Sequence, residues 1–163
     1  MIVIVMGVSG AGKSTLAARL AERTGWSFAE GDDYHPEANK AKMAAGIALT
    51  DEDRLPWLDA LRAVVDGWQR EGRHGILTCS ALKESYRERL AGGIADLRFV
   101  WLDPSRLVLE DRLAHRAGHY MNPNLLGSQL ATLEPPQGAL RLAGDESSEE
   151  AVAKVLNWIG FQS

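Results

Sequence analysis

The sequence that decides the fold is the glycine-rich stretch at residues 7–14, Gly7-Val8-Ser9-Gly10-Ala11-Gly12-Lys13-Ser14. It matches the pattern G-x-x-x-x-G-K-S, which is typical of loops that bind nucleotide phosphates, the P-loops. Glycine has no Cβ, so the backbone of such a loop turns tightly and brings its N–H groups against phosphate oxygens. The pattern predicts that Lys13 contacts the β- and γ-phosphates of ATP and that Ser14 ligates Mg²⁺.

The residues on either side of this loop support the prediction. Residues 2–6, Ile-Val-Ile-Val-Met, form a short apolar run that suits a buried parallel strand. After the loop, apolar residues recur at helical spacing over residues 16–21, so a helix would begin at the phosphates and favour anions there. A chance glycine-rich turn is the alternative. The predicted nucleotide-binding residues are Gly7, Val8, Ser9, Gly10, Ala11, Gly12, Lys13, Ser14 and Thr15.

Composition limits the class of protein. The chain has 163 residues, 45% hydrophobic and 25% charged, which suits one soluble domain over residues 1–163. The formal net charge of −4 indicates no basic surface for nucleic acid or membrane. The single cysteine, Cys79, excludes a disulfide framework, and the apolar N-terminus is too short for a signal peptide. We therefore expect a cytoplasmic protein with no nucleic-acid or membrane partner.

A second candidate for chemistry follows the next predicted strand, residues 26–29. Three carboxylates, those of Glu30, Asp32 and Asp33, lie within four residues just past it. In an open α/β sheet, ligands bind beyond the carboxyl ends of the strands. The Mg²⁺ and the acceptor hydroxyl of a kinase both need oxygen partners, which this cluster offers. An ordinary acidic turn that caps a helix is the alternative.

The next segment combines helix signals with a candidate arginine. Residues 37–45 are expected to be helical, and Thr50 resembles the N-cap of another helix, with acidic residues in the first turn. Pro56 suits a first helical position, so the main helix is expected to start there. Asp53 and Arg54 are either a solvated cap or part of a site. The apolar face of the main helix would comprise Trp57, Leu58, Leu61, Val64, Val65 and Trp68.

Further strands are predicted at residues 76–79, 97–102 and 139–143, and further helices at residues 84–91, 125–133 and 148–159. Strands that alternate with helices predict an α/β fold with a central, mostly parallel five-stranded sheet. A common P-loop NTPase places an Asp that directs Mg²⁺ at the end of a strand, and none follows residues 76–79. The cluster at residues 30–33 is therefore the available source of that carboxylate. Cys79 is expected to be a small buried hydrophobic residue.

Another helix is predicted to begin at residues 103–105, and it carries two arginines. Arg112 and Arg116 are four residues apart, on one helix face. The helix leads into a stretch bounded by glycine and proline, which suits a lid at about residues 117–124 that closes over the phosphates. Surface salt bridges are the alternative role for the arginines, and His119 is expected to have no catalytic part.

Four stretches beyond the P-loop carry more specific motifs: Gly-Asp-Asp-Tyr-His-Pro at 31–36, Leu-Thr-Asp-Glu-Asp-Arg-Leu-Pro-Trp at 49–57, Cys-Ser-Ala-Leu-Lys at 79–83 and Gly-His-Tyr-Met at 118–121. Together with the P-loop they strongly resemble the gluconokinase family, small P-loop metabolite kinases related to the shikimate kinases. Residues 129–136 continue the likeness. The resemblance implies a three-layer P-loop kinase fold with a short lid, and transfer of the ATP γ-phosphate to the 6-hydroxyl of D-gluconate.

The resemblance also implies roles for individual residues. By likeness to the shikimate kinases, Asp32 would hold and deprotonate the acceptor hydroxyl. Arg54 would pair with the sugar-acid carboxylate through its planar, bidentate guanidinium. Arg112 would lie near the adenine, and Arg116 near the transferring phosphoryl group. Two further substrate contacts are implied, Lys83 and Gln129.

Some questions stay open at this point. Shikimate kinases have Asp two residues before the base, where this chain has Glu30, so direct contact between Glu30 and Mg²⁺ is unsettled. The family suggests a homodimer. The residues alone do not name the acceptor, so a nucleotide-binding switch protein and a kinase for shikimate, another small hydroxy acid or a nucleoside monophosphate remain alternatives.

Overall fold

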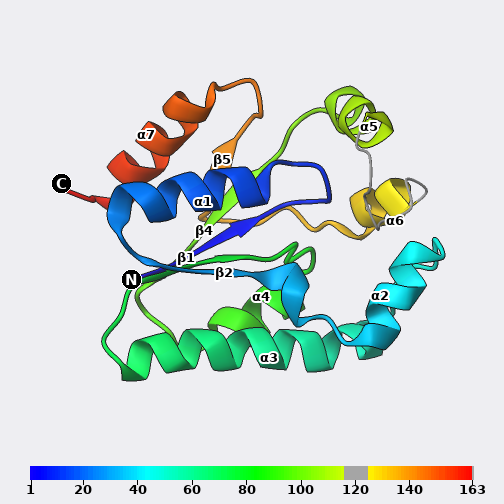
Figure 1. Cartoon of the computed structure of the whole chain (residues 1–163), viewed down its shortest axis with the longest axis horizontal. Coiled ribbons are helices and arrows are strands. Elements are labelled where there is room, and N and C mark those ends of the chain that lie inside the picture. The colour runs from blue at the N-terminus through cyan, green and yellow to red at the C-terminus, as the bar shows by residue number, and fades with distance from the viewer. Residues whose placement is uncertain (116–124, 163) are drawn as a thin grey trace.

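Five strands form one sheet in the computed structural model, which describes residues 1–115 and 125–162 (Figure 1). Their spatial order is β2-β3-β1-β4-β5, and each neighbouring pair runs parallel. Runs of Val, Ile and Leu suit such strands because helices bury both faces of a parallel sheet. The strands are β1 (Ile2–Met6), β2 (Ser27–Glu30), β3 (Gly75–Thr78), β4 (Leu97–Leu102) and β5 (Leu140–Leu142).

Helices cover both faces of the sheet and so make three layers (Figure 1). On one face α1 packs against α7, and on the other α3 packs against α4. Three shorter helices, α2, α5 and α6, stand beyond the carboxyl ends of the strands (Figure 1). The helices are α1 (Lys13–Thr24), α2 (Glu37–Ala44), α3 (Asp51–Arg70), α4 (Glu84–Ala91), α5 (Arg106–Ala114), α6 (Leu125–Thr132) and α7 (Ser148–Ile159), with a 3₁₀ helix η1 (Gly31–Tyr34) after β2.

This architecture confirms the predicted α/β class, its five-stranded sheet and its three layers. The centre of the sheet is β1, whose five side chains are all buried. Leu58 and Leu61 of α3 and Leu20 of α1 are also buried in the core, and burying each such side chain stabilises a fold by about 1.5–3 kcal/mol. The P-loop therefore extends from a fully buried strand at the centre of the sheet.

The start of α3 differs from the prediction. Thr50 is the N-cap, as expected: its Oγ1 accepts a hydrogen bond from the Asp53 N–H at 3.1 Å, and Asp53 accepts one from the Thr50 N–H at 2.9 Å. The expectation that the main helix starts at Pro56 was wrong, because the helix begins at Asp51 and contains the proline. Pro56 has no backbone N–H, so the carbonyl of Glu52, four residues earlier, lacks its usual helical donor. Glu52 is exposed. The reciprocal cap stabilises the first turn of the helix ahead of the proline.

Cys79 follows β3 directly and is buried, as predicted. Burial raises the pKa of its thiol to about 12, so the side chain stays protonated and behaves as a small apolar group. Within residues 1–115 and 125–162, the helices are too short or too polar to cross a bilayer.

Candidate active site

The P-loop connects the end of β1 to the first turn of α1 (Figure 1). Gly7 has a φ of +146°, and a Cβ at this position would lie 2.7 Å from the carbonyl oxygen of Leu102 in β4. Gly12 is the N-cap of α1 and has a φ of +98°. Glycine is needed at both positions, since other residues rarely adopt these conformations. The free N–H groups at the start of α1 make this loop a site for anions.

Two side chains hold the P-loop in place, one from the loop itself and one from α6. Lys13 Nζ donates to the carbonyl oxygens of Gly7 and Val8, at 2.9 and 3.0 Å. The N–H of Ser9 donates to Oε1 of Gln129 in α6, at 2.7 Å. The structure therefore brings Gln129, which the resemblance places among the substrate contacts, directly onto the phosphate-binding loop.

Oxygen atoms gather where α1 begins and β2 ends. Ser14 Oγ donates to Oε1 of Glu30 at 2.8 Å, and the hydroxyl of Thr78 in β3 donates to the same oxygen. Thr78 also accepts the N–H of Gly31, at 2.9 Å. A Cβ on Gly31 would lie 1.9 Å from the Thr78 carbonyl oxygen, so glycine is what lets η1 lie against β3.

The oxygens of Ser14 and Glu30 are of the ligand types that Mg²⁺ prefers. Hydroxyl and carboxylate oxygens are hard ligands, and Mg²⁺ in kinases keeps several waters and binds one or two side chains together with substrate phosphates. Among the described residues no three acidic, histidine or cysteine side chains cluster as a metal site. Ser14 and Glu30 would therefore complete a shell made mainly by nucleotide and water oxygens.

A cavity of about 520 Å³ opens beside the P-loop. Arg112 of α5 reaches across its edge, where Nη1 donates to the carbonyl oxygen of Gly10 at 3.0 Å. Five of the residues predicted to bind nucleotide line this cavity: Gly10, Ala11, Gly12, Thr15 and Arg112. Its walls come from the P-loop, α1, α5 and the chain from β5 to the start of α7, which contributes Ser148.

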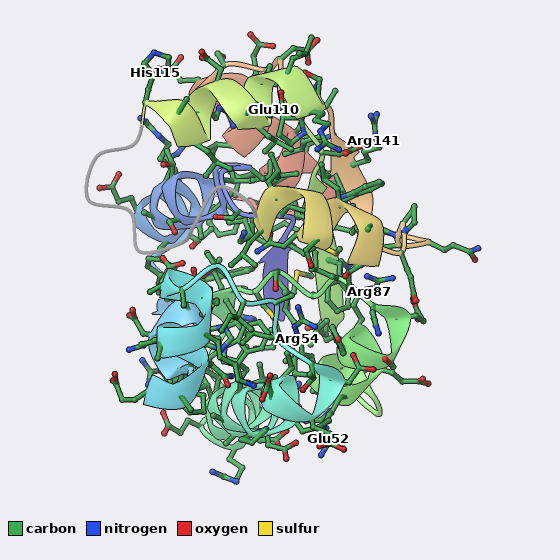
Figure 2. The ribbon with its side chains drawn as sticks, turned by 90° about the vertical axis from the view of Figure 1, so that its right-hand side faces the viewer. Glu52, Arg54, Arg87, Glu110, His115 and Arg141 are labelled. Carbon is green, nitrogen blue, oxygen red and sulfur yellow. The ribbon has the colours of Figure 1, made fainter. Side chains whose placement is uncertain are left out.

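A second, smaller cavity contains three of the four residues predicted to bind the acceptor. Asp32 lies on its wall, whereas its neighbour Asp33 is exposed and does not line it. Figure 2 views this end of the molecule and shows Arg54 near the centre of the view and His115 at the outer edge of the molecule. We call this cavity the acceptor cleft; its polar lining includes Ser9, Lys13, Asp32, His35, Arg54 and Gln129.

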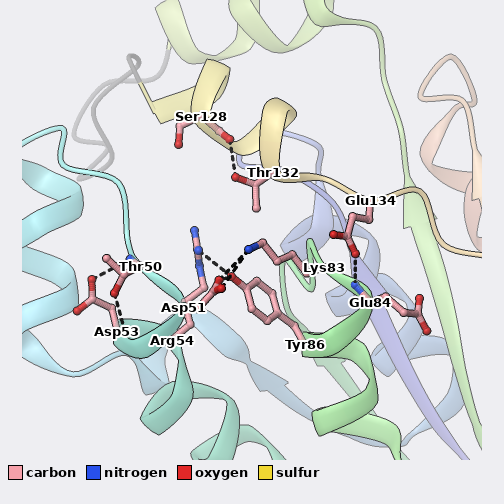
Figure 3. A network of polar contacts seen from close by, with 10 residues as sticks. All are labelled: Thr50, Asp51, Asp53, Arg54, Lys83, Glu84, Tyr86, Ser128, Thr132 and Glu134. Atoms are coloured by element: carbon pink, nitrogen blue, oxygen red, sulfur yellow. Dashed lines mark hydrogen bonds and ion pairs between the residues drawn. The ribbon is translucent and has the colours of Figure 1, made fainter.

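A network of polar contacts positions Arg54 (Figure 3). Its Nη1 donates to the hydroxyl of Tyr86 in α4 at 2.9 Å, and its guanidinium lies 5.4 Å from the centre of that ring. The Tyr86 hydroxyl in turn donates to Asp51, which also pairs with Lys83 at 2.9 Å. These hydrogen bonds, from Tyr86 first and then Lys83, lower the pKa of Asp51. The start of α3 is thus tied to α4.

The structure separates the predicted substrate residues into two groups. Asp32, Arg54 and Gln129 line the acceptor cleft together. Lys83 is not among the lining residues described, and its ammonium group is held by Asp51. Arg116 and the predicted lid, with His119, lie outside the described residues.

Sequence reasoning missed three residues that shape the cleft: Tyr86, His35 and Asn39. Spacing carried a signal for each. Tyr86 follows Lys83 by three residues, and Asn39 follows His35 by four, so each pair shares one side of a helix start. A histidine and an asparagine at such a spacing, beside the acidic cluster, are candidates for a hydrogen-bonded pair.

The fold and these two cavities define a P-loop kinase. A family model described as an AAA domain matches residues 2–136. The chain is 48% identical to the gluconokinase of Gluconobacter oxydans (strain 621H), over 94% of this chain and 88% of that protein. The chain belongs to the gluconokinase family.

Two solved structures agree with this assignment. A gluconokinase from Sinorhizobium meliloti 1021 superposes with a TM-score of 0.82 at 40% identity, covering 99% of this chain and 96% of that one. An unliganded sugar kinase from Janibacter sp. HTCC2649 superposes with a TM-score of 0.92 at 42% identity, covering 98% and 94%. The similarity thus extends through both cavities and beyond the P-loop.

Proposed function

We propose that this protein uses ATP to phosphorylate D-gluconate at its 6-hydroxyl, giving 6-phospho-D-gluconate. The observation that carries the proposal is the composition of one wall: Asp32, Arg54 and Lys13 line the same cleft. The carboxylate of Asp32 can accept a hydrogen bond from a hydroxyl, and the guanidinium of Arg54 can pair with a carboxylate. Lys13 belongs to the P-loop. The names of its relatives support gluconate as the acceptor.

ATP would bind with its phosphates on the P-loop and its base in the 520 Å³ cavity. The backbone N–H groups of the loop would hold the β- and γ-phosphates, and Lys13 would add a positive charge there. Arg112, which already reaches the loop at Gly10, would lie near the adenine. When bound between the phosphates, Ser14 and Glu30, Mg²⁺ would neutralise charge on the β- and γ-oxygens.

Gluconate would occupy the acceptor cleft with its two ends held by different groups. Arg54 is already oriented by Tyr86 and would pair with the carboxylate. Asp32 would orient the 6-hydroxyl and take its proton as the bond to phosphorus forms. Gln129 and Lys83 would make further contacts, the first from α6 beside the P-loop and the second from the start of α4.

The remaining parts of the proposal concern closure and assembly. Residues 1–163 would form a single kinase domain in which a lid at about residues 117–124 closes over the phosphates and excludes water. Arg116 would approach the transferring phosphoryl group on closure. A homodimer and a cytoplasmic location remain predictions from the family and from composition.

A screen of acceptors tests the proposal directly. Purified protein would be assayed for ATP consumption with D-gluconate, shikimate and nucleoside monophosphates, and the product would be located by ³¹P NMR. We expect turnover with D-gluconate and a phosphate ester at carbon 6. Lys13→Met is the matched control and should lose about 100-fold or more, because a cation is removed from the phosphate site. Turnover with another acceptor and none with D-gluconate would overturn the proposal.

A further inference from the structure

His35 is a buried histidine on the wall of the acceptor cleft, and the reaction described above gives it no role. Its ring stacks on Trp57 of α3, with ring centres 4.0 Å apart and an angle of 15° between the planes. Trp57 is itself fixed, because its Nε1 donates to the carbonyl oxygen of Gly31 at 2.8 Å. The imidazole therefore has one orientation in the cleft.

Asn39 determines which ring nitrogen carries the proton. Its side-chain nitrogen donates to the backbone carbonyl oxygen of Asp53 at 2.8 Å and lies 3.2 Å from Nδ1 of His35. A carbonyl oxygen only accepts, so the amide must present its NH₂ group to both partners. Nδ1 is therefore the acceptor, and the proton of the neutral ring lies on Nε2.

The neutral form of the ring is the stable one at pH 7. Burial lowers the pKa of His35 to about 4, and the positive charges of Arg54 and Lys40 act in the same direction, whereas Asp32 opposes them. Within residues 1–115 and 125–162, the structure shows no hydrogen-bond partner for Nε2, and the atom is not sealed from solvent. The cleft thus contains an uncharged N–H donor beside Asp32.

We propose that the Nε2–H of His35 donates a hydrogen bond to an alcohol oxygen of the acceptor and thereby selects polyhydroxy acids. This inference rests on the proposed function and deepens it. Arg54 recognises a carboxylate by charge, and any small acid has one. A neutral donor suits a hydroxyl group, and a site built to bond a hydroxyl discriminates strongly against analogues that lack it.

Two substitutions of nearly equal polarity distinguish a hydrogen bond from Nε2 to the acceptor from a purely structural role of His35. In His35→Gln the side-chain amide extends to about the position of Nε2 and can donate there, whereas in His35→Asn it ends near Nδ1. We expect His35→Asn to raise the KM for D-gluconate about tenfold, the typical effect of one lost hydrogen bond. His35→Gln should remain within about threefold of the wild type on the same scale. The KM for ATP should not change in either variant, which also reports on folding.

The matched control is His74, a second histidine that stacks on a tryptophan, Trp26, with ring centres 4.8 Å apart. It lies before β3, at the opposite end of the strands from the cleft. His74→Asn should leave the KM for D-gluconate unchanged. If His35→Asn does not fold, His35→Phe, which keeps an aromatic ring against Trp57 and lacks the donor, takes its place with the same expected result.

Deoxy substrates identify the bond itself. Wild type and His35→Asn would be compared on D-gluconate and on its 2-, 3-, 4- and 5-deoxy analogues, each by kcat/KM. At one position the loss from deoxygenation and the loss from substitution should not multiply, because both remove the same hydrogen bond. Wild-type KM in His35→Asn, or full multiplication at every position, would overturn this inference alone. A wild type that does not phosphorylate D-gluconate would overturn the proposed function as well.

Discussion

Ser14 of the P-loop donates a hydrogen bond of 2.8 Å to Glu30, the residue at the end of β2. The longer glutamate side chain therefore contacts the hydroxyl that is proposed to bind Mg²⁺. Whether Glu30 itself contacts the metal is tested by the Glu30→Gln substitution. A second hydroxyl, that of Thr78, fixes the same carboxylate oxygen.

Glu30→Gln should weaken the use of Mg²⁺. The substitution keeps the shape of the side chain but removes the negative charge next to the proposed metal position. We expect the Mg²⁺ concentration for half-maximal activity to rise about tenfold or more, as is usual when a group that supports a metal ligand is lost. The measurement is kcat against free Mg²⁺ at saturating ATP. Asp33→Asn is the control, since Asp33 is exposed; a Glu30→Gln curve equal to the wild type would argue against a metal role.

Arg54→Ala should separate the two substrates. Arg54 lines the acceptor cleft but is not among the residues that line the nucleotide cavity. Loss of a charge-assisted pair costs about 1.5–3 kcal/mol, so the KM for gluconate should rise about tenfold or more. The KM for ATP should change little. Tyr86→Phe, which removes the hydroxyl that orients Arg54, should give a smaller rise in the gluconate KM; equal effects on both KM values would make Arg54 purely structural.

The stability of the protein should fall in mild acid because of His35. Its pKa is near 6.5 when unfolded and about 4 in the fold, so the unfolded state takes up a proton first as the pH drops. The free energy of unfolding should therefore decline from pH 6.5 to pH 4, by about 2 kcal/mol for this residue. Urea unfolding at several pH values measures it. In His35→Phe the free energy of unfolding should depend less on pH in this range. An unchanged pH dependence would contradict the lowered pKa of His35 in the fold.

Arg87 should matter for stability more than any exposed arginine of α4. It is buried and donates to the carbonyl oxygens of Ala81 and Glu134, at 2.6 and 2.8 Å. Arg87→Met would leave both carbonyls without this partner and should lower the free energy of unfolding by about 2–4 kcal/mol. Arg89→Met, which breaks an exposed pair with Asp59, should cost less than about 1 kcal/mol. Similar urea midpoints for Arg87→Met and Arg89→Met would contradict the larger contribution expected of Arg87.

Local signals made most of the fold predictable. The bounds of β4, α4 and α7 match the predicted ranges, and the other strands agree within one residue at each end. Apolar runs and helix caps depend on neighbouring residues, so the sequence displays them directly. The prediction at Pro56 was wrong because the preference of proline for a first helical position competed with a capping box that begins six residues earlier, at Thr50.

The site could be predicted only in part, because its geometry depends on contacts between distant segments. The P-loop and the acidic cluster are local motifs. The bond between Ser9 and Gln129 joins residues 120 apart, and that between Arg54 and Tyr86 joins residues 32 apart. The proton on Nε2 of His35 follows from the backbone carbonyl of Asp53, through Asn39. Only the pair of His35 and Asn39 has a spacing that hints at its contact, whereas the bonds that join distant segments have no sequence pattern of their own.

Asp32 is proposed to orient the acceptor hydroxyl and to take its proton. Asp32 lines the cleft with Arg54 and Lys13, whereas Asp33 does not line it and is exposed. An amide at position 32 could still hold the hydroxyl but could not take its proton. The two isosteric variants, Asp32→Asn and Asp33→Asn, therefore differ in whether the carboxylate that is lost lines the cleft.

The measurement is kcat for gluconate phosphorylation by both variants, with nucleotide affinity as the folding control. Asp32→Asn should bind ATP normally and lose about 10²–10⁴-fold in kcat, the usual contribution of a general base. Asp33→Asn should stay within a few-fold of the wild type. An active Asp32→Asn beside an inactive Asp33→Asn would contradict this account of the acceptor cleft.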